Sequence, residues 1–71
     1  MRTELQSFKS MLQRARVEFR HRHHPRWATA DRIIFEAADT KLCFSFDHNG
    51  YFLDYSWGSW VDQDLGGDVE L

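Results

Sequence analysis

The residues with the greatest capacity for chemistry lie in one segment, residues 21–27, which reads His-Arg-His-His-Pro-Arg-Trp. On a strand, His21 and His23 would point to the same side, as two ligands of a zinc ion can. His24 would point to the other side, and no third ligand stands at a defining spacing. A solvated basic strand end explains the segment better, so we expect no metal and no cofactor.

Two further groups that can serve in catalysis lack converging partners. Asp47 and His48 are neighbours in sequence, and neighbours on a strand face opposite sides. Cys43 falls in the middle of a predicted sheet, where a thiol is usually packed rather than reactive. No glycine-rich phosphate loop precedes a helix. We therefore expect no catalytic residue and a protein that is not an enzyme.

Length and composition predict one small domain. The chain has 71 residues, with six Phe, three Trp and two Tyr, so aromatic side chains must supply much of the core. Its single cysteine excludes an internal disulfide and favours a reducing compartment. No apolar run is long enough to cross a bilayer, and no signal-peptide core is present. These features predict a soluble protein of the cytoplasm.

The two halves of the chain carry opposite charge. Residues 1–32 hold eight Lys or Arg and three acids, whereas residues 33–71 hold one Lys and eight acids. A basic stripe next to Trp27 would suit nucleic acid, which makes nucleic-acid binding the alternative function. The acidic half and a pI of about 6.0 count against it. The candidate nucleic-acid contacts are Arg14, Arg16, Arg20, Arg22 and Arg26.

A hairpin around Asn49-Gly50 is predicted to organise the aromatic residues. This dipeptide tolerates the positive φ angles of a two-residue type I′ turn and lies between two alternating apolar runs. The turn places Phe44 opposite Tyr55, with the bulky residues on one face: Leu42, Phe44, Phe46, Leu53, Tyr55 and Trp57. The other face carries Cys43, Ser45, Asp47, Phe52, Asp54 and Ser56.

An amphipathic helix over residues 3–16 is predicted to cover the aromatic face. Thr3 followed by Gln6 is a capping-box pattern. An apolar stripe recurs at three- and four-residue steps: Leu5, Phe8, Leu12 and Ala15. Alternation over residues 17–24 then predicts a strand that Pro25 stops; a helix extending to about Arg20 is the competing interpretation.

Residues 32–37 are the next predicted strand. A tight turn at Asp39-Thr40, or a four-residue loop in the same register, places Phe35 against Phe44 and Arg32 opposite Asp47. The predicted fold is α+β, with the N-terminal helix packed on one face of a 3–4-stranded antiparallel β-meander. Residues 1–61 form this single domain, and residues 62–71 form an acidic flexible C-terminal tail.

The outer face of the predicted sheet is half apolar with an acidic rim. In a chain this small, such a face suits a homodimer or the docking of another protein. The residues predicted to bind protein are Ile34, Glu36, Phe52, Asp54 and Trp60.

Several sequence features over residues 5–60 resemble small uncharacterised proteins encoded by bacteriophages. They are Leu-Gln-Arg-Ala at the helix end, then Val-Glu-Phe, then Phe-Ser-Phe-Asp-His-Asn-Gly-Tyr-Phe before a final Trp. The chain departs from the pattern at Arg16, where such proteins often have Gly, and in its His/Arg-rich strand. The resemblance implies a viral accessory protein in the host cytoplasm and supplies no catalytic motif. The sequence therefore predicts a non-enzymatic protein-binding module, an inhibitor or adaptor that occludes a host protein.

Overall fold

The computed structural model describes residues 2–63 and 66–71. These residues contain one α-helix, α1 (Glu4–Arg14), and a 3-10 helix, η1 (Ser59–Asp62). They also contain five strands: β1 (Arg20–His23), β2 (Asp31–Ala37), β3 (Thr40–Phe46), β4 (Phe52–Trp57) and β5 (Val69–Glu70). The strands form one antiparallel sheet in the order β4-β3-β2-β1-β5. The predicted α+β fold is confirmed, with β5 added to the meander.

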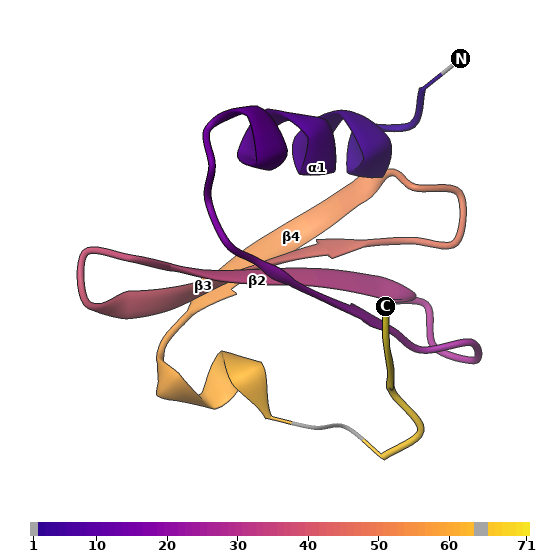
Figure 1. Ribbon diagram of the computed structural model, residues 1–71. Coiled ribbons are helices and arrows are strands. Elements are labelled where there is room, and N and C mark those ends of the chain that lie inside the picture. Colours follow the sequence, from indigo (N-terminus) through magenta and orange to yellow (C-terminus); the bar gives the residue numbers. More distant parts are fainter. Residues whose placement is uncertain (1, 64–65) are drawn as a thin grey trace.

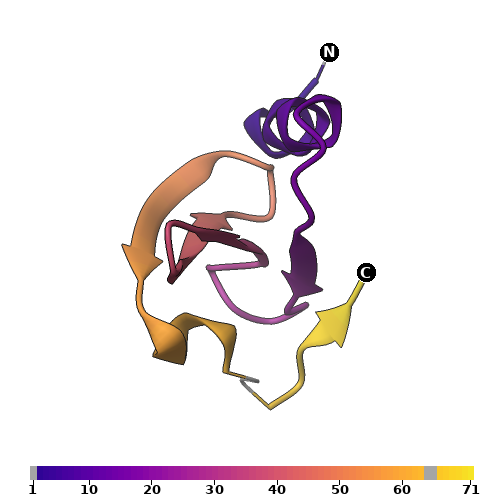
Figure 2. The same ribbon diagram turned by 60° about the vertical axis from the view of Figure 1, so that its left-hand side comes forward.

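Figure 1 shows α1 on one side of the sheet and η1 with the C-terminal segment on the other. In Figure 2 η1 follows β4 on the side of the sheet away from α1, and β5 lies beside β1. Each face of the sheet is therefore partly covered, one by the helix and the other by η1 and the residues near it.

The start of α1 follows the predicted capping box. The Thr3 hydroxyl accepts a hydrogen bond from the Gln6 backbone N–H at 3.1 Å, and the Gln6 side chain accepts one from the Thr3 N–H at 3.0 Å. Two N–H groups that the first turn cannot satisfy thereby find partners. The adjacent Leu5 N–H donates to the Gly50 carbonyl at 2.9 Å, which ties the helix to the loop before β4.

The end of α1 is a Schellman motif with arginine in the position that glycine usually takes. The Val17 N–H donates to the Leu12 carbonyl at 2.9 Å and the Arg16 N–H to the Gln13 carbonyl at 3.1 Å. Arg16 has a φ of 57°, in the left-handed region. The helix therefore ends before residue 16, and residues 17–19 precede β1 rather than belonging to the predicted strand over 17–24.

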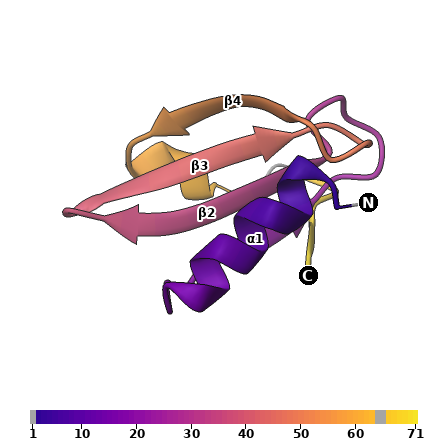
Figure 3. The ribbon, with the colours of Figure 1, turned by 90° about the horizontal axis from the view of Figure 1, so that it is seen from above.

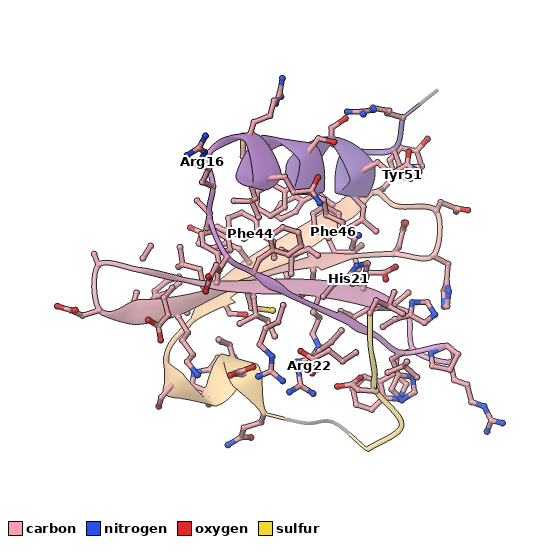
Figure 4. All side chains as sticks on the ribbon, in the orientation of Figure 1. Arg16, His21, Arg22, Phe44, Phe46 and Tyr51 are labelled. Atoms are coloured by element: carbon pink, nitrogen blue, oxygen red, sulfur yellow. The ribbon has the colours of Figure 1, made fainter. Side chains whose placement is uncertain are left out.

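The helix-side core joins α1 to the aromatic face of the sheet. Leu12, Ile33 and Phe46 are buried together, and the Phe8 ring lies 4.7 Å from the Phe44 ring between centroids. Figure 4 shows Phe44 and Phe46 between the helix and the sheet. This arrangement is the one that the alternation of the β3 residues predicts.

The β3–β4 hairpin keeps the predicted register over most of its length but not at its turn. Phe44 pairs with Tyr55 as expected, yet a bulge beyond Ser45 puts Phe52 opposite Phe46. The loop is longer than a type I′ turn, since the Asp47 N–H donates to the Tyr51 carbonyl at 2.9 Å. The Asp47 carboxylate organises this loop by accepting from the N–H groups of Asn49 and Tyr51, both at 2.9 Å.

The bulge moves Phe52 to the helix side of the sheet. Its ring lies 5.9 Å from that of Phe46 and 6.0 Å from that of Phe44. The prediction that Phe52 faces outward is therefore wrong, because one extra residue in a strand reverses the alternation beyond it.

The β2–β3 turn lies one residue earlier than predicted. Ala37 pairs with Thr40, which leaves Ala38 and Asp39 as the turn residues, at φ angles of 50° and 68°. The register shifts by two residues relative to the prediction, so each side chain keeps its face. The expected Arg32–Asp47 pair is wrong, however, because Arg32 lies opposite Ser45.

The C-terminal residues cover the second face of the sheet. Val61 of η1 packs on Ile34 and Cys43, which form a second buried cluster with it. Val69–Glu70 form β5, which pairs with β1. The acidic tail predicted over residues 62–71 therefore contains the end of η1 and all of β5, while residues 64 and 65 lie outside the described residues.

Candidate functional site: the two sheet edges

Strand β4 forms an edge of the sheet and carries large exposed side chains. Tyr55 is 57% exposed and Trp57 60%, although both belong to the aromatic face. Figure 3 shows the reason: α1 crosses over β2 and leaves β4 uncovered. The helix stripe is long enough for only part of that face.

The exposed rings of β4 form an ordered stack. Tyr55 lies 6.0 Å from Phe44 and 5.8 Å from Trp57 between ring centroids, with interplanar angles of 25° and 27°. The partly buried ring of Phe44 thus supports the two exposed ones. Within β4 the only charged residue is Asp54. A strand edge of this kind lacks the lysines and prolines that commonly prevent further pairing.

The opposite edge is polar and is occupied by the chain itself. Arg20 of β1 donates from Nε and Nη2 to the two Glu70 carboxylate oxygens, at 2.7 and 3.0 Å. Its Nη1 donates to Asp62 Oδ1 at 2.6 Å, and Lys41 Nζ donates to Asp62 Oδ2 at 2.8 Å. One arginine fork therefore holds η1 and β5 at once.

Two arginines lie side by side deeper in this face. Arg22 pairs with Arg32 across β1 and β2, and both are buried. Arg32 donates to the Asp68 carboxylate, while Arg22 approaches Asp62 at 3.9 Å and Asp68 at 4.0 Å. Figure 4 shows Arg22 on the side of the sheet that faces the C-terminal segment. Buried guanidinium groups require such carboxylates, because an uncompensated charge is costly in a dry environment.

The ion pairs shift the titration of both partners. The hydrogen bond from Lys41 chiefly lowers the pKa of Asp62; burial opposes this effect, and the bond from Arg20 adds to it. The hydrogen bond from Arg20 likewise lowers the pKa of Glu70. The pKa of Arg20 is raised, first by its bond to Glu70. All three groups are charged at neutral pH, so the contacts are charge-assisted hydrogen bonds.

A third polar cluster links the helix to β1 and β2. His21 Nε2 lies 2.6 Å from Asp31 Oδ1, and Lys9 Nζ lies 3.1 Å from His21 Nδ1. A lysine ammonium can only donate, so Nδ1 accepts and Nε2 carries the proton that is donated to Asp31. His23 Nδ1 also lies 3.0 Å from Asp31 Oδ1. The cluster fixes α1 over β1 by polar contacts.

His24 and Cys43 are packed against other parts of the fold. His24 stacks on Trp27 with ring centroids 4.5 Å apart, and its Nε2 lies 3.2 Å from the Gly66 carbonyl oxygen. Burial raises the pKa of the Cys43 thiol. Over residues 2–63 and 66–71, no group of three His, Cys, Asp or Glu side chains is arranged to hold a metal ion.

An open groove of about 570 Å³ lies where the chain enters β1. Phe19 and Phe35 contribute apolar surface to it, and Glu36 also lines it. Arg20 and Asp62 line it as well, so the groove adjoins the ion pairs of the β1 edge. No helix in the described part of the chain is long and apolar enough to span a membrane.

The residues predicted to bind protein do not share one surface. Ile34 is only 3% exposed beneath Val61, so its predicted role on an accessible face is wrong. Phe52 contacts the aromatic face, and Glu36 lines the groove. Asp54 and Trp60 are exposed, on β4 and η1 respectively.

The residues predicted to bind nucleic acid are also divided. Arg14 and Arg16 are exposed at the end of α1, and Arg26 is exposed after β1. Arg20 and Arg22 instead lie against the C-terminal acids. Figure 4 shows Arg16 and Arg22 on opposite sides of the sheet, so the set does not form one stripe.

The β1 edge includes residues that the sequence interpretation left in the tail. Asp68, Glu70 and Leu71 contact β1 or its neighbour β2. The alternation of acidic and apolar residues in Asp68-Val69-Glu70-Leu71 is the period-two signal of a strand. That signal was available in the sequence but is short.

Comparison with known proteins finds no matching family model, no matching curated protein and no matching solved structure.

Proposed function

We propose that the protein is a non-enzymatic protein-binding module that uses the β4 edge to add a strand from its partner. The observation that carries this proposal is the exposed stack of Tyr55 and Trp57 beside an edge strand. Strand addition supplies backbone hydrogen bonds, and side chains on alternate positions supply specificity.

The composition of this edge supports binding of an apolar segment. Tyr and Trp are enriched among the residues that contribute most to protein interfaces, because they bury large areas with little loss of conformational freedom. Exposed apolar residues of β4 and its loop also include Tyr51, Phe52 and Leu53. Several large apolar side chains on one edge of so small a protein are more than isolated surface residues would give.

The expected ligand is an extended segment with apolar side chains at alternate positions. Its side chains on the helix side would contact the Tyr55–Trp57 stack, and Asp54 would disfavour an acidic residue on the other side. A host protein bound by occlusion, as the phage resemblance implies, is the partner we propose. A second copy of the chain would use the same edge.

A selection from a random peptide display library on the folded protein tests the proposal. We expect enriched peptides to share an alternating apolar pattern. The double variant Tyr55→Lys/Trp57→Lys should bind them at least about tenfold more weakly, because it removes two anchor side chains. The matched control Gln13→Lys/Gln63→Lys adds the same charge at exposed positions away from β4 and should bind as the parent does.

Two further measurements decide between strand addition and other binding. Bound peptide should slow amide exchange in β4, and sedimentation should show whether the parent chain self-associates through the same residues. Peptides that bind both double variants equally, or that leave β4 exchange unchanged, would refute the proposal.

A further inference from the structure

The last residues of the chain already bind the β1 edge in the manner of an added peptide. Arg22 pairs with Glu70 and His23 with Val69, and the Leu71 N–H donates to the His21 carbonyl at 2.8 Å. These are ladder contacts of an extended segment on a strand edge.

The side chains of this segment match cations on the sheet. Asp68 and Glu70 are two residues apart, which places them on the same side of an extended chain. Asp68 accepts from Arg32 and Glu70 accepts from Arg20. The Arg20 contact is bidentate, which is the geometry that makes arginine selective for carboxylates. The edge thus binds two carboxylates that stand two residues apart.

The segment has a shallow apolar attachment at this edge. Val69 is 51% exposed and Leu71 69%, so neither is deeply buried. β5 pairs with β1 over only two residues. Polar contacts therefore provide most of the attachment, and an equivalent segment from another molecule could provide the same ones.

We propose that the β1 edge, with Arg20 and Arg32, is a binding site for an extended acidic peptide whose carboxylates stand two residues apart, and that residues 68–71 occupy it as an internal ligand. The internal ligand competes at the high effective concentration that a tether gives. A partner gains access when it outcompetes this segment. The site lies at the edge opposite to β4 and stands independently of the function proposed for β4.

The bound segment favours a peptide over nucleic acid as the occupant. A phosphate backbone could satisfy the arginines, but it offers no amide for the His21 carbonyl and no strand to pair with β1. The contacts of Leu71 and Val69 with β1 are backbone contacts, and these define the site as much as the ion pairs do.

The test uses a labelled hexapeptide with the sequence of residues 66–71 and the full-length protein. In the variant Asp68→Asn/Glu70→Gln the internal ligand lacks both carboxylates. We expect this variant to bind the hexapeptide at least about tenfold more tightly than the parent chain does. A hexapeptide with Asn and Gln at the two acidic positions should bind to neither protein.

A second variant weakens the attachment of the internal ligand without changing its charge. Gly67 has a φ of 95°, and a Cβ there would come within 2.9 Å of His24 Nε2. Gly67→Ala should therefore weaken the attachment of the segment and strengthen hexapeptide binding. Gly66→Ala is the matched control, since a Cβ at Gly66 meets nothing within 4 Å, and it should behave as the parent does.

Three results would overturn the proposal. The first is a folded Asp68→Asn/Glu70→Gln protein that does not bind the hexapeptide, and the second is equal binding of the acidic and amide peptides. The third is a thymidine oligonucleotide that binds this variant more tightly than the hexapeptide at physiological salt, which would identify a polyanion site. If the double variant does not fold, Gly67→Ala decides: a detached segment, shown by amide exchange, without stronger hexapeptide binding refutes the site.

Discussion

The β1 and β4 sides of the sheet differ in whether a further strand of the chain pairs with them. Every edge strand presents backbone groups that can pair with another chain. At β1 the protein adds its own β5 and fixes it with the ion pairs of Arg20 and Arg32. At β4 no strand of the described residues pairs with the outer side; the Phe52 N–H donates to Glu4 Oε1 at 3.0 Å, and Tyr55 and Trp57 are exposed. The contrast supports the proposal that a partner binds at β4.

The chemistry of the two edges also differs in what each can recognise. Aromatic side chains bind through buried apolar area, which is large but tolerant of sequence. Arginine forks bind through charge and direction, so they select carboxylates at defined positions. The two proposals therefore assign apolar segments to the β4 edge and acidic segments to the β1 edge.

The largest expected effect is a loss of stability when a buried carboxylate is removed near β1, compared with removal of an exposed one on β4. Asp68→Ala leaves Arg32 in a nearly dry environment without its carboxylate, which should lower the free energy of unfolding by about 3 kcal/mol. Asp54→Ala on the exposed β4 strand should change it by less than about 0.5 kcal/mol. Urea denaturation of the two variants measures both values. Equal effects would mean that the β1 edge is no more dependent on its charges than the β4 edge.

A second change loosens the start of β4 instead. Gly50 has a φ of 81°, and a Cβ there would lie 2.6 Å from the Thr3 Cβ. Gly50→Ala should therefore cost about 2 kcal/mol of stability, since it combines left-handed strain with a clash at the helix cap. Gly66→Ala is the control and should be nearly neutral. A stable Gly50→Ala protein would show that the loop before β4 can move away from α1.

Acid should release the β1 edge while leaving β4 in place. The pKa values of Asp62 and Glu70 are lowered in the folded protein, so their ion pairs stabilise it fully above the ordinary carboxyl range, near pH 4. This stabilisation is lost as the pH falls through the lowered folded-state values. Amide exchange should then show reduced protection of the Leu71 N–H, with the β3–β4 pairing protected at the same pH. Loss of amide protection at Leu71 and in the β3–β4 pairing at the same pH would contradict the expectation that β5 detaches independently of β4.

The sequence predicts those parts of the fold that depend on alternation and local capping. Thr3 with Gln6 marks the helix start, and the β3 pattern identifies Phe44 and Phe46 as core residues. The bulge after Ser45 could not be predicted from the sequence, because it depends on how the Asp47 side chain organises the loop. A single inserted residue therefore changed the predicted face of Phe52.

The candidate site was harder to predict than the fold because it depends on contacts distant in sequence. The charge split was visible, but the pairing of Arg20 with Glu70 spans 50 residues. The exposure of Tyr55 and Trp57 follows from the direction in which α1 crosses the sheet, which no local pattern specifies. The alternation of β4 predicts the face on which these rings lie, but it carries no information on where the helix crosses that face.

The smallest expected effect concerns the β2–β3 turn, which belongs to neither edge. A substitution there should change the stability of the whole domain without changing binding at β4 or β1. Ala38 and Asp39 hold positive φ angles, as a type I′ turn requires, although alanine is poorly suited to that region. Ala38→Asn/Asp39→Gly should raise the free energy of unfolding by about 0.5–1 kcal/mol, because Asn-Gly adopts these angles with less strain. Urea denaturation measures the gain, and the peptide affinities of both edges should stay unchanged. A loss of stability would mean that Ala38 or Asp39 makes a contact that the turn geometry does not explain.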